Sequence, residues 1–388
     1  MDKYSFLNAA HTSLFESLYE QYRTQPDSVE PSWKAFFQGF DFGAESVLED
    51  WDLGELSSGQ LSHPALGETV VVPDSVQKEF QVVKLIDGYR TRGHLFTKTN
   101  PVRERRKYSP TLDLVNFGLT EADLDHTFNA GEILGIGAAT LRSIIEHLEH
   151  IYCDSIGVEY MYIRNPERIE WIQSYLNQND NHTEFAPQQQ RYILEKLNQA
   201  VSFESFLHTK YVGQKRFSLE GNESLIPALD AIIERAAEKG VKQFVMGMAH
   251  RGRLNVLTNI FGKSPKDIFS EFDGKDYEEA IFDGDVKYHL GWTSKRETNN
   301  GHVVNMNIAP NPSHLETVGG IVEGISRAKQ DNDHPSAPFE VLPIVIHGDA
   351  AIAGQGVVYE VVQMSQLDGY KTSGTIHIVV NNQIAVTT

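Results

Sequence analysis

The sequence predicts an α/β protein in which an N-terminal helical arm and a helical domain precede a domain with a mostly parallel sheet. Two observations predict the helical part, because apolar residues recur at helical spacing in residues 14–22 and again in residues 141–152. A third predicts the sheet, since residues 341–380 contain a buried strand, a helical stretch and a second buried strand. Strands joined in this way are parallel, and the crossover between them is right-handed.

The composition limits the class of protein. The chain has 388 residues, of which 40% are hydrophobic, so we expect two or three folded units that need no covalent staples. Its formal net charge of −19 disfavours non-specific binding to nucleic acid or to an anionic membrane. The same charge requires any anionic ligand to be held by local cationic donors. With a single cysteine, Cys153, an internal disulfide and a cysteine-rich zinc site are excluded.

Targeting signals are not expected from the sequence. No segment approaches the roughly 20 consecutive apolar residues that a membrane-spanning helix needs. The N-terminus lacks a basic region followed by an apolar stretch, and Asp2, Glu16 and Glu20 fit a mitochondrial transit peptide badly. We therefore expect a cytoplasmic protein.

The first part of the chain predicts an arm and a linker. Residues 1–40 predict a helical arm rich in aromatic side chains, with Trp33 and Phe37 in its second half. The arm is too short to bury its aromatic side chains within itself, so we expect it to dock on the rest of the chain or on a partner. Residues 41–75 predict an acidic, mobile linker, because residues 41–59 contain carboxylates and no Lys or Arg.

Two domains are expected after the linker. Residues 76–200 predict a small, mostly helical domain. Residues 201–388 predict an α/β domain, in which Asn299-Asn300-Gly301 forms a hairpin turn. Its expected strands are residues 244–246, 303–308, 341–346 and 375–380.

Polar residues follow the last two strands at the same edge of the predicted sheet. Asp349 comes after the first of these strands, and Asn382 follows the second. Carboxylate and amide oxygens suit Mg²⁺, which usually shares its coordination shell with phosphates of a bound molecule. Between them, residues 354–356 lie near a helix start, where backbone N–H groups can receive an anion. The pair predicts a diphosphate–Mg²⁺ site; the alternative is that Asp349 caps a helix and Asn382 forms a turn.

A histidine lies just after the first strand of this domain. His250 is flanked by Arg251 and Arg253. A partly buried structural histidine is the alternative interpretation. Because two arginines stand beside it, we interpret His250 as part of an anion pocket.

Several longer motifs carry a resemblance to a known family. They are residues 208–221 (HTKYVGQKRFSLEG), 246–255 (MGMAHRGRLN), 311–316 (NPSHLE), and Gly348-Asp349 with Asn381-Asn382. Together they resemble the thiamin-diphosphate-dependent decarboxylating component of 2-oxoglutarate dehydrogenase. The resemblance covers nearly all of the chain, including the N-terminal arm. It implies that residues 201–388 are the first thiamin-diphosphate-binding α/β domain, the half that holds the diphosphate and Mg²⁺.

The resemblance also implies which residues contact the cofactor. Asp349 and Asn382 would bind Mg²⁺ through their side chains, and Ile384 through its backbone oxygen. Arg251 would contact the diphosphate of thiamin diphosphate. The full set of cofactor-binding residues is Arg251, Ser313, Leu315, Asp349, Asn382 and Ile384.

Two histidines are the catalytic residues that the resemblance implies. His250 and His289 would face the substrate. A five-carbon dicarboxylate in an acidic protein needs local donors for its far carboxylate. Histidines can donate such hydrogen bonds and can also move protons.

The implied activity is decarboxylation of 2-oxoglutarate in the tricarboxylic acid cycle, with transfer of the succinyl group to a lipoyl group. The implied partners are a lipoyl-bearing succinyltransferase, dihydrolipoyl dehydrogenase and a second copy of the chain in a homodimer. One alternative is a decarboxylase acting on 2-oxoadipate, which would need a larger pocket at His250 and His289. Another is a non-catalytic docking fragment that uses residues 1–40.

The sequence departs from the family at two places. Ala385-Val386 stand where the family has a Gly-Phe pair, near the loop over the diphosphate. The chain ends at Thr388, before the second α/β domain that carries the activating glutamate in the family. Because the cofactor site is assembled between two such domains, we expect this chain alone to be inactive.

Overall fold

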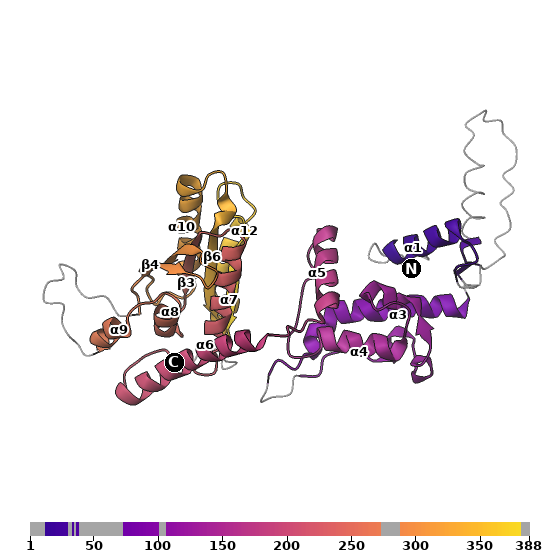
Figure 1. Cartoon of the computed structure of the whole chain (residues 1–388), viewed down its shortest axis with the longest axis horizontal. Helices are drawn as coiled ribbons and strands as arrows, with labels where there is room; N and C mark the ends of the chain where they lie inside the picture. Colours follow the sequence, from indigo (N-terminus) through magenta and orange to yellow (C-terminus); the bar gives the residue numbers. More distant parts are fainter. Residues whose placement is uncertain are drawn as a thin grey trace, which may run out of the picture. The chain divides into compact units, whose positions relative to one another are not determined.

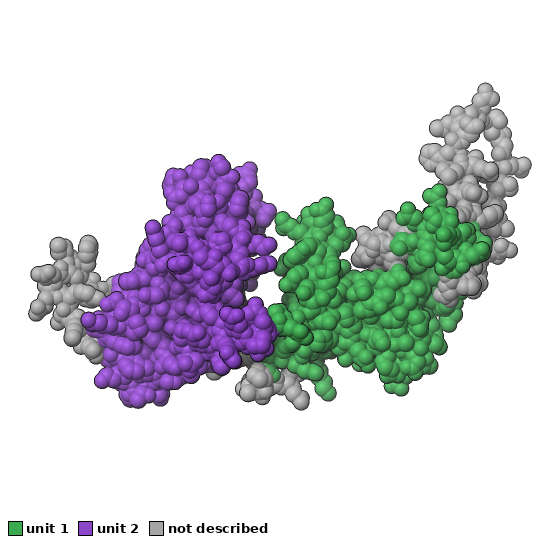
Figure 2. Space-filling view, viewed as in Figure 1, with its two compact units in different colours: residues 1–184 green, residues 185–388 purple. Residues whose placement is uncertain are grey.

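The computed structural model forms two compact units. They are residues 1–184 and residues 185–388, coloured separately in Figure 2. The structure describes residues 12–29, 33–34, 36–38, 73–100, 106–272 and 288–381. Within these ranges, none of the helices is long and apolar enough to cross a bilayer.

Unit 1 is mostly helical, which agrees with the helical periodicity in its part of residues 76–200. Its α-helices are α1 (Thr12–Thr24), α3 (Asp74–Arg92), α4 (Leu141–Tyr152) and α5 (Pro166–Asn179). The short elements are η2 (Gly93–Phe96), η3 (Leu114–Phe117), η4 (Glu121–Asp123), η5 (Asn129–Leu134) and the antiparallel pair β1 (Thr127–Phe128) and β2 (Ala139–Thr140). The helix predicted at residues 141–152 is confirmed. Its Leu141, Ile144 and Leu148 are fully buried, because helical spacing places them on one face.

The described part of the N-terminal arm packs on unit 1. Trp33 and Phe37 are almost fully buried and share an apolar cluster with Val76, at the start of α3. The rings of Trp33 and Phe80 lie 6.0 Å apart, edge to face. Figure 1 shows α1 beside α3. Of the two expectations for the arm, docking on the chain itself is the one observed. The predicted linker lies outside the described residues as far as residue 72.

Unit 2 begins with a long helix and continues as an α/β domain. Its helices are α6 (Pro187–Lys210), α7 (Leu225–Glu238), α8 (Arg253–Asn259), α9 (Pro265–Phe272), α10 (Thr317–Asp333), η6 (Pro338–Glu340), α11 (Asp349–Gly354) and α12 (Gly356–Met364). Its strands are β3 (Gln243–Met248), β4 (Trp292–Glu297), β5 (Val303–Ile308), β6 (Val341–Gly348) and β7 (Ile376–Val380). The division falls at residues 184–185 rather than near residue 200. The reason is that α6 is one continuous helix that packs on α7 and α8.

The sheet of unit 2 has the strand order β4-β5-β3-β6-β7. β3 is parallel to β5 and to β6, and β6 is parallel to β7. β4 is antiparallel to β5 and forms the predicted hairpin with it. The mostly parallel sheet and the parallel strands of the β6–β7 crossover are therefore confirmed.

Helices cover both faces of this sheet (Figure 1). Phe244, Met246 and Ile346 point to one face, in a core shared with α6, α7 and α8. Val245 points to the other face, where α10 packs. At Gly247 an added Cβ would lie 2.5 Å from Val322 of α10, so only glycine permits this close packing. Successive side chains of β3 alternate between the two faces because the period of a strand is two residues, and both faces are covered, so all six residues of β3 are buried.

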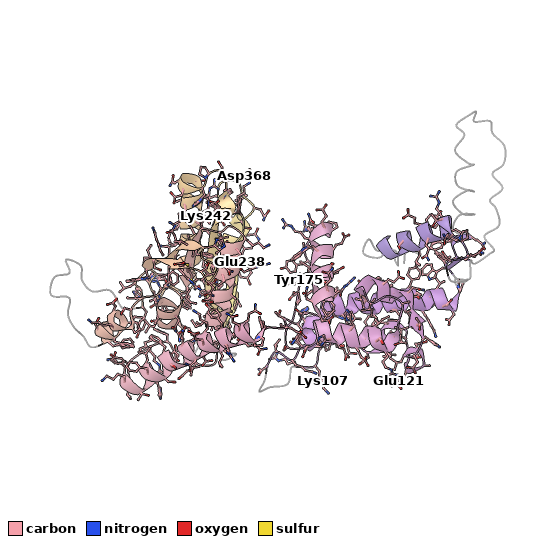
Figure 3. All side chains as sticks on the ribbon, viewed as in Figure 1. Lys107, Glu121, Tyr175, Glu238, Lys242 and Asp368 are labelled. Carbon is pink, nitrogen blue, oxygen red and sulfur yellow. The ribbon has the colours of Figure 1, made fainter. Side chains whose placement is uncertain are left out.

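An ion pair joins the residues that directly precede β3 and β6. Lys242, labelled in Figure 3, places its Nζ 2.7 Å from Glu340 Oε1 and donates its backbone N–H to the Glu340 carbonyl. Both residues immediately precede their strands. The opposite edge, where β3, β6 and β7 end, carries the residues predicted to be functional.

Candidate functional site

The candidate site lies where β3 and β6 end side by side. Met248 pairs with Ile346, and the backbone N–H of Ala249 donates to the Ile346 carbonyl at 3.0 Å. The chain runs from β3 to β4 and β5 on one side and then to β6 on the other, so the strand order reverses beside β3. In open α/β sheets, ligands bind outside the carboxyl ends of the strands at such a point.

His250, two residues after β3, lies in a cluster of rings. Its ring centroid is 5.3 Å from that of His289, 5.4 Å from Phe217 and 6.0 Å from Tyr288. Burial lowers the pKa of His250, a hydrogen bond with the Asn311 backbone opposes this shift, and the nearby charge of Arg253 adds to it. The buried Nε2 of His250 has no hydrogen-bond partner among the described residues. Buried polar atoms are rarely left unpaired. An unpaired nitrogen at this position is therefore a candidate to hydrogen-bond a ligand.

His289 connects this cluster to the Ser313 loop. His289 Nε2 and Ser313 Oγ lie 3.2 Å apart, and the N–H of Asn311 donates to the His289 carbonyl at 3.0 Å. The structure therefore brings a residue expected to face the substrate next to one expected to line the cofactor pocket. Leu315, in the same loop, is 47% exposed.

Arg253 holds this part of the site together. Its guanidinium is fully buried and donates to carbonyl oxygens at the end of β3, after β5 and in the His289 segment, as well as to a side chain. The acceptors are Met248 O (3.3 Å), Asn311 Oδ1 (2.6 Å), Leu290 O (2.9 Å) and Ala309 O (2.8 Å). Burial lowers the pKa of Arg253 to about 10. Arg253 flanks His250 in the sequence, but its two terminal nitrogens, Nη1 and Nη2, are engaged by oxygens of the protein itself.

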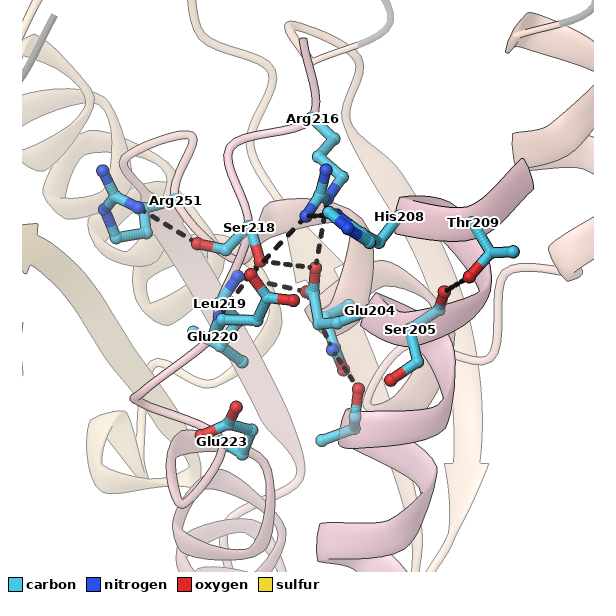
Figure 4. A network of polar contacts seen from close by, with 12 residues as sticks. Glu204, Ser205, His208, Thr209, Arg216, Ser218, Leu219, Glu220, Glu223 and Arg251 are labelled. Atoms are coloured by element: carbon cyan, nitrogen blue, oxygen red, sulfur yellow. Dashed lines mark hydrogen bonds and ion pairs between the residues drawn. The ribbon is translucent and has the colours of Figure 1, made fainter. Parts of the chain in front are cut away.

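Arg251 points toward the segment after α6 (Figure 4). It is half-buried, and its Nη1 donates to the Ser218 carbonyl at 3.1 Å. Glu204 of α6 fixes that segment, because its buried carboxylate accepts from Ser218 Oγ at 2.9 Å and from the Leu219 N–H at 3.1 Å. Asn255 Nδ2 of α8 donates to the same carboxylate at 3.1 Å. Glu204 therefore joins the motif at residues 208–221 to the motif that contains His250.

The strand-tip residues are placed in part. Asp349 is half-buried and is the first residue of α11, immediately after β6. Gly348 pairs with Val380, so the tips of β6 and β7 are neighbours, as predicted. Asn382, Ile384 and the Ala385-Val386 pair lie outside the described residues. Among the residues described, no group of three or more His, Cys, Asp or Glu side chains could hold a metal ion.

Three polar side chains form a hydrogen-bonded chain that was not predicted, and one of them, His347, lies two residues before Asp349. Glu316 Oε2 accepts from His347 Nδ1 at 2.5 Å, and both side chains are almost fully buried. His347 Nε2 lies 2.8 Å from His377 Nδ1, with the two rings nearly parallel. The signal was the position of His347 directly before Gly348-Asp349. Its partners lie far away in the sequence and had no local pattern.

Two parts of the chain match models of known protein families. Residues 195–388, half of the chain, match the family described as dehydrogenase E1 component. The chain belongs to the dehydrogenase E1 component family. Residues 4–44 of this E1 chain also match the family described as 2-oxoglutarate dehydrogenase N-terminus.

Relatives of this E1 chain carry a more specific name. It is 42% identical over 392 residues to the 2-oxoglutarate dehydrogenase E1 component of Azotobacter vinelandii. That match covers 98% of this chain and 41% of the relative. It is 41% identical over 394 residues to the protein of the same name from Cupriavidus necator, covering 99% of this chain and 41% of that protein. The E1 chain thus spans less than half the length of these relatives.

Proposed function

We propose that this chain provides the diphosphate-binding half of the active site of a 2-oxoglutarate dehydrogenase E1 component. Such an enzyme decarboxylates 2-oxoglutarate and passes the succinyl group to a lipoyl group. The observation that carries the proposal is the histidine pair at the sheet edge, in a chain whose relatives bear that name over nearly all of its length.

The histidine pair suits the far carboxylate of the substrate. The chain has a net charge of −19, so an anionic substrate needs donors placed close to it. His250 Nε2 is buried without a partner among the described residues, and the His289 ring lies 5.3 Å away. A carboxylate hydrogen-bonded by Nε2 would satisfy that atom and favour protonation of the ring. The two imidazoles hold the dicarboxylate and exchange protons with it.

The residues at the same edge fit thiamin diphosphate and Mg²⁺. Asp349 supplies a half-buried carboxylate at a strand tip, and Mg²⁺ is commonly bound through one or two carboxylates together with phosphates. We infer that Asn382 and Ile384 complete the metal site, that Arg251 contacts the diphosphate, and that Ser313 and Leu315 line the cofactor pocket. When bound, thiamin diphosphate supplies the electron sink that a 2-oxo acid needs to lose CO₂.

The proposed partners follow from the same assignment. They are a lipoyl-bearing succinyltransferase, dihydrolipoyl dehydrogenase and a second copy of the chain in a homodimer. The match of residues 4–44 to the 2-oxoglutarate dehydrogenase N-terminus supports a role for the arm in the complex. We place the enzyme in the bacterial cytoplasm and in the tricarboxylic acid cycle.

Turnover of alternative 2-oxo acids tests the function. The full-length protein, supplied with thiamin diphosphate, Mg²⁺ and an artificial electron acceptor, should release CO₂ from 2-oxoglutarate faster than from 2-oxoadipate or pyruvate. His250→Asn and His289→Asn should each lower kcat/KM for 2-oxoglutarate by about 10- to 100-fold, since hydrogen bonds to a charged group contribute about 1.5–3 kcal/mol. Higher kcat/KM on 2-oxoadipate, or no effect of either histidine variant, would contradict the proposal.

A further inference from the structure

The buried Glu316–His347 pair connects the segments that carry the proposed cofactor residues. Glu316 follows the Ser313 and Leu315 loop and stands directly before α10. His347 lies on β6, two residues before Asp349. His377 lies on β7, the strand that leads toward Asn382. One hydrogen-bonded chain therefore joins the three segments on which most of the proposed cofactor contacts depend.

Burial and a short hydrogen bond hold the Glu316 and His347 side chains in fixed positions. The side chains of His347 and Glu316 are 3% and 4% exposed, respectively, and the hydrogen bond between them is 2.5 Å long. Hydrogen bonds to a carboxylate are stronger than neutral ones, and burial strengthens them further. Glu316 has a φ of 67°, in the left-handed region that non-glycine residues rarely adopt. The bond to His347 holds Glu316, and with it the turn after Leu315, in this unfavourable conformation.

The carboxylate also sets the direction of the hydrogen bond with His347. A carboxylate oxygen can only accept, so His347 donates to Glu316 through Nδ1. On its other side, Nε2 of His347 lies within hydrogen-bond distance of His377 Nδ1, at 2.8 Å. Glu316 therefore fixes the orientation of the His347 ring and, through His347, the point at which β6 ends before Asp349.

We propose that Glu316 and His347 are positioning residues for the cofactor half-site, holding the Ser313–Leu315 loop and the Asp349 strand tip in register with each other. The proposal rests on the proposed function, because it concerns the site for thiamin diphosphate and Mg²⁺. Neither residue is required to touch the cofactor. Residues that orient metal ligands commonly change affinity or activity by about 10- to 100-fold when they are replaced.

Cofactor binding by the full-length protein tests the proposal. His347→Leu should weaken the affinity for thiamin diphosphate with Mg²⁺, measured by calorimetry, by about 10- to 100-fold. His347→Asn should recover most of this loss, because its side-chain amide nitrogen occupies the place of Nδ1 and can donate to Glu316. Glu316→Gln, which keeps the size of the side chain, should weaken binding in the same direction. The apparent KM for the cofactor should rise more than kcat falls at saturating cofactor.

Glu323→Gln is the matched control. Glu323, which lies on α10, accepts from Thr372 Oγ1 at 2.6 Å and from Thr375 Oγ1 at 2.7 Å, just before β7 begins. Its replacement should lower the midpoint of thermal unfolding but leave cofactor affinity unchanged. Unchanged affinity in His347→Leu and Glu316→Gln, or an equal loss in Glu323→Gln, would overturn the positioning role while the proposed function stands. If the unaltered protein binds no thiamin diphosphate with Mg²⁺, the proposed function fails as well.

Discussion

The two halves of the candidate site are held in place by opposite means. On the β3 side, one buried cation, Arg253, donates to oxygens of four other residues and fixes the His250 and His289 segments. On the β6 side, one buried carboxylate, Glu316, accepts from His347 and fixes the strand tip before Asp349.

The difference reflects what each half is proposed to bind. Because Nη1 and Nη2 of Arg253 already donate to oxygens of the protein, we propose that the neighbouring histidines receive the substrate carboxylate. Burial lowers the pKa of His250. On the other side, the half-buried Asp349 is not part of the Glu316–His347 hydrogen bond and lies at the tip of its strand, where we expect a cation. Arg253 and Glu316, which fix the two halves of the site, are thus different residues from those proposed to contact the ligand.

Breaking the β3 half should have the largest effect. Arg253→Met should lower the free energy of unfolding by about 4 kcal/mol, because it leaves several buried oxygens without donors. Arg251→Met is the control for stability, since the Arg251 guanidinium is half-buried and donates to the Ser218 carbonyl at 3.1 Å. Urea unfolding of both variants gives the comparison. Equal losses would show that Arg253 has no special role.

Breaking the β6 half should act on binding rather than on folding. Asp349→Ala should abolish Mg²⁺-dependent binding of thiamin diphosphate, a loss of at least about 100-fold, or about 2.7 kcal/mol. Its thermal unfolding should change little, because Asp349 is only half-buried. Asp331→Ala removes a carboxylate of α10 that pairs with Arg327 and should leave binding intact. Calorimetric titration that gives the same affinity for Asp349→Ala and the unaltered protein would remove Asp349 from the site.

A smaller effect is expected where α6 supports the β3 half. Glu204→Gln should lower the free energy of unfolding by about 1–2 kcal/mol, since an amide has one oxygen and cannot accept all three of the present hydrogen bonds. The Arg251 segment should also become more mobile, which faster backbone hydrogen exchange at residues 218–219 would report. Unchanged exchange there would show that Glu204 does not order this segment.

The smallest effect should come from pH. The folded-state pKa of His250 lies below its ordinary value of 6.5 because the ring is buried. The unfolded chain therefore binds more protons near and below pH 6.5, and stability falls as the pH falls through that value. His250→Asn should lose less stability than the unaltered protein between pH 7.5 and 5.5. The difference should be smaller than about 1 kcal/mol, because the ring is only partly buried and water screens it. Parallel pH profiles would contradict this role of burial.

Much of unit 2 could be predicted from the sequence because its signals are local. The apolar runs at residues 244–246, 303–308 and 341–346 became β3, β5 and β6, and Asn299-Asn300-Gly301 became the hairpin turn. The strand–helix–strand order also predicted that Asp349 follows a parallel strand whose neighbour leads to Asn382. The boundary between the units was harder to predict, because nothing in the sequence of α6 marks residue 200 as lying inside a continuous helix.

The sequence by itself determined four of the five strands of unit 2, the edge of the sheet at which we propose that ligands bind, and the family to which the chain belongs. It could do so because periodicity and contiguous motifs are properties of neighbouring residues. Only the tertiary structure decided which charged residues are available to a ligand. Arg253 flanks His250 in the sequence, and the fold buries it among carbonyl oxygens. Glu316, His347 and His377 come from three distant segments, and they form one chain only because β6, β7 and the start of α10 pack together. Whether a buried charged residue is available to a ligand depends on the groups that pack against it in the folded protein. Those groups come from distant segments, so the neighbouring sequence does not identify them.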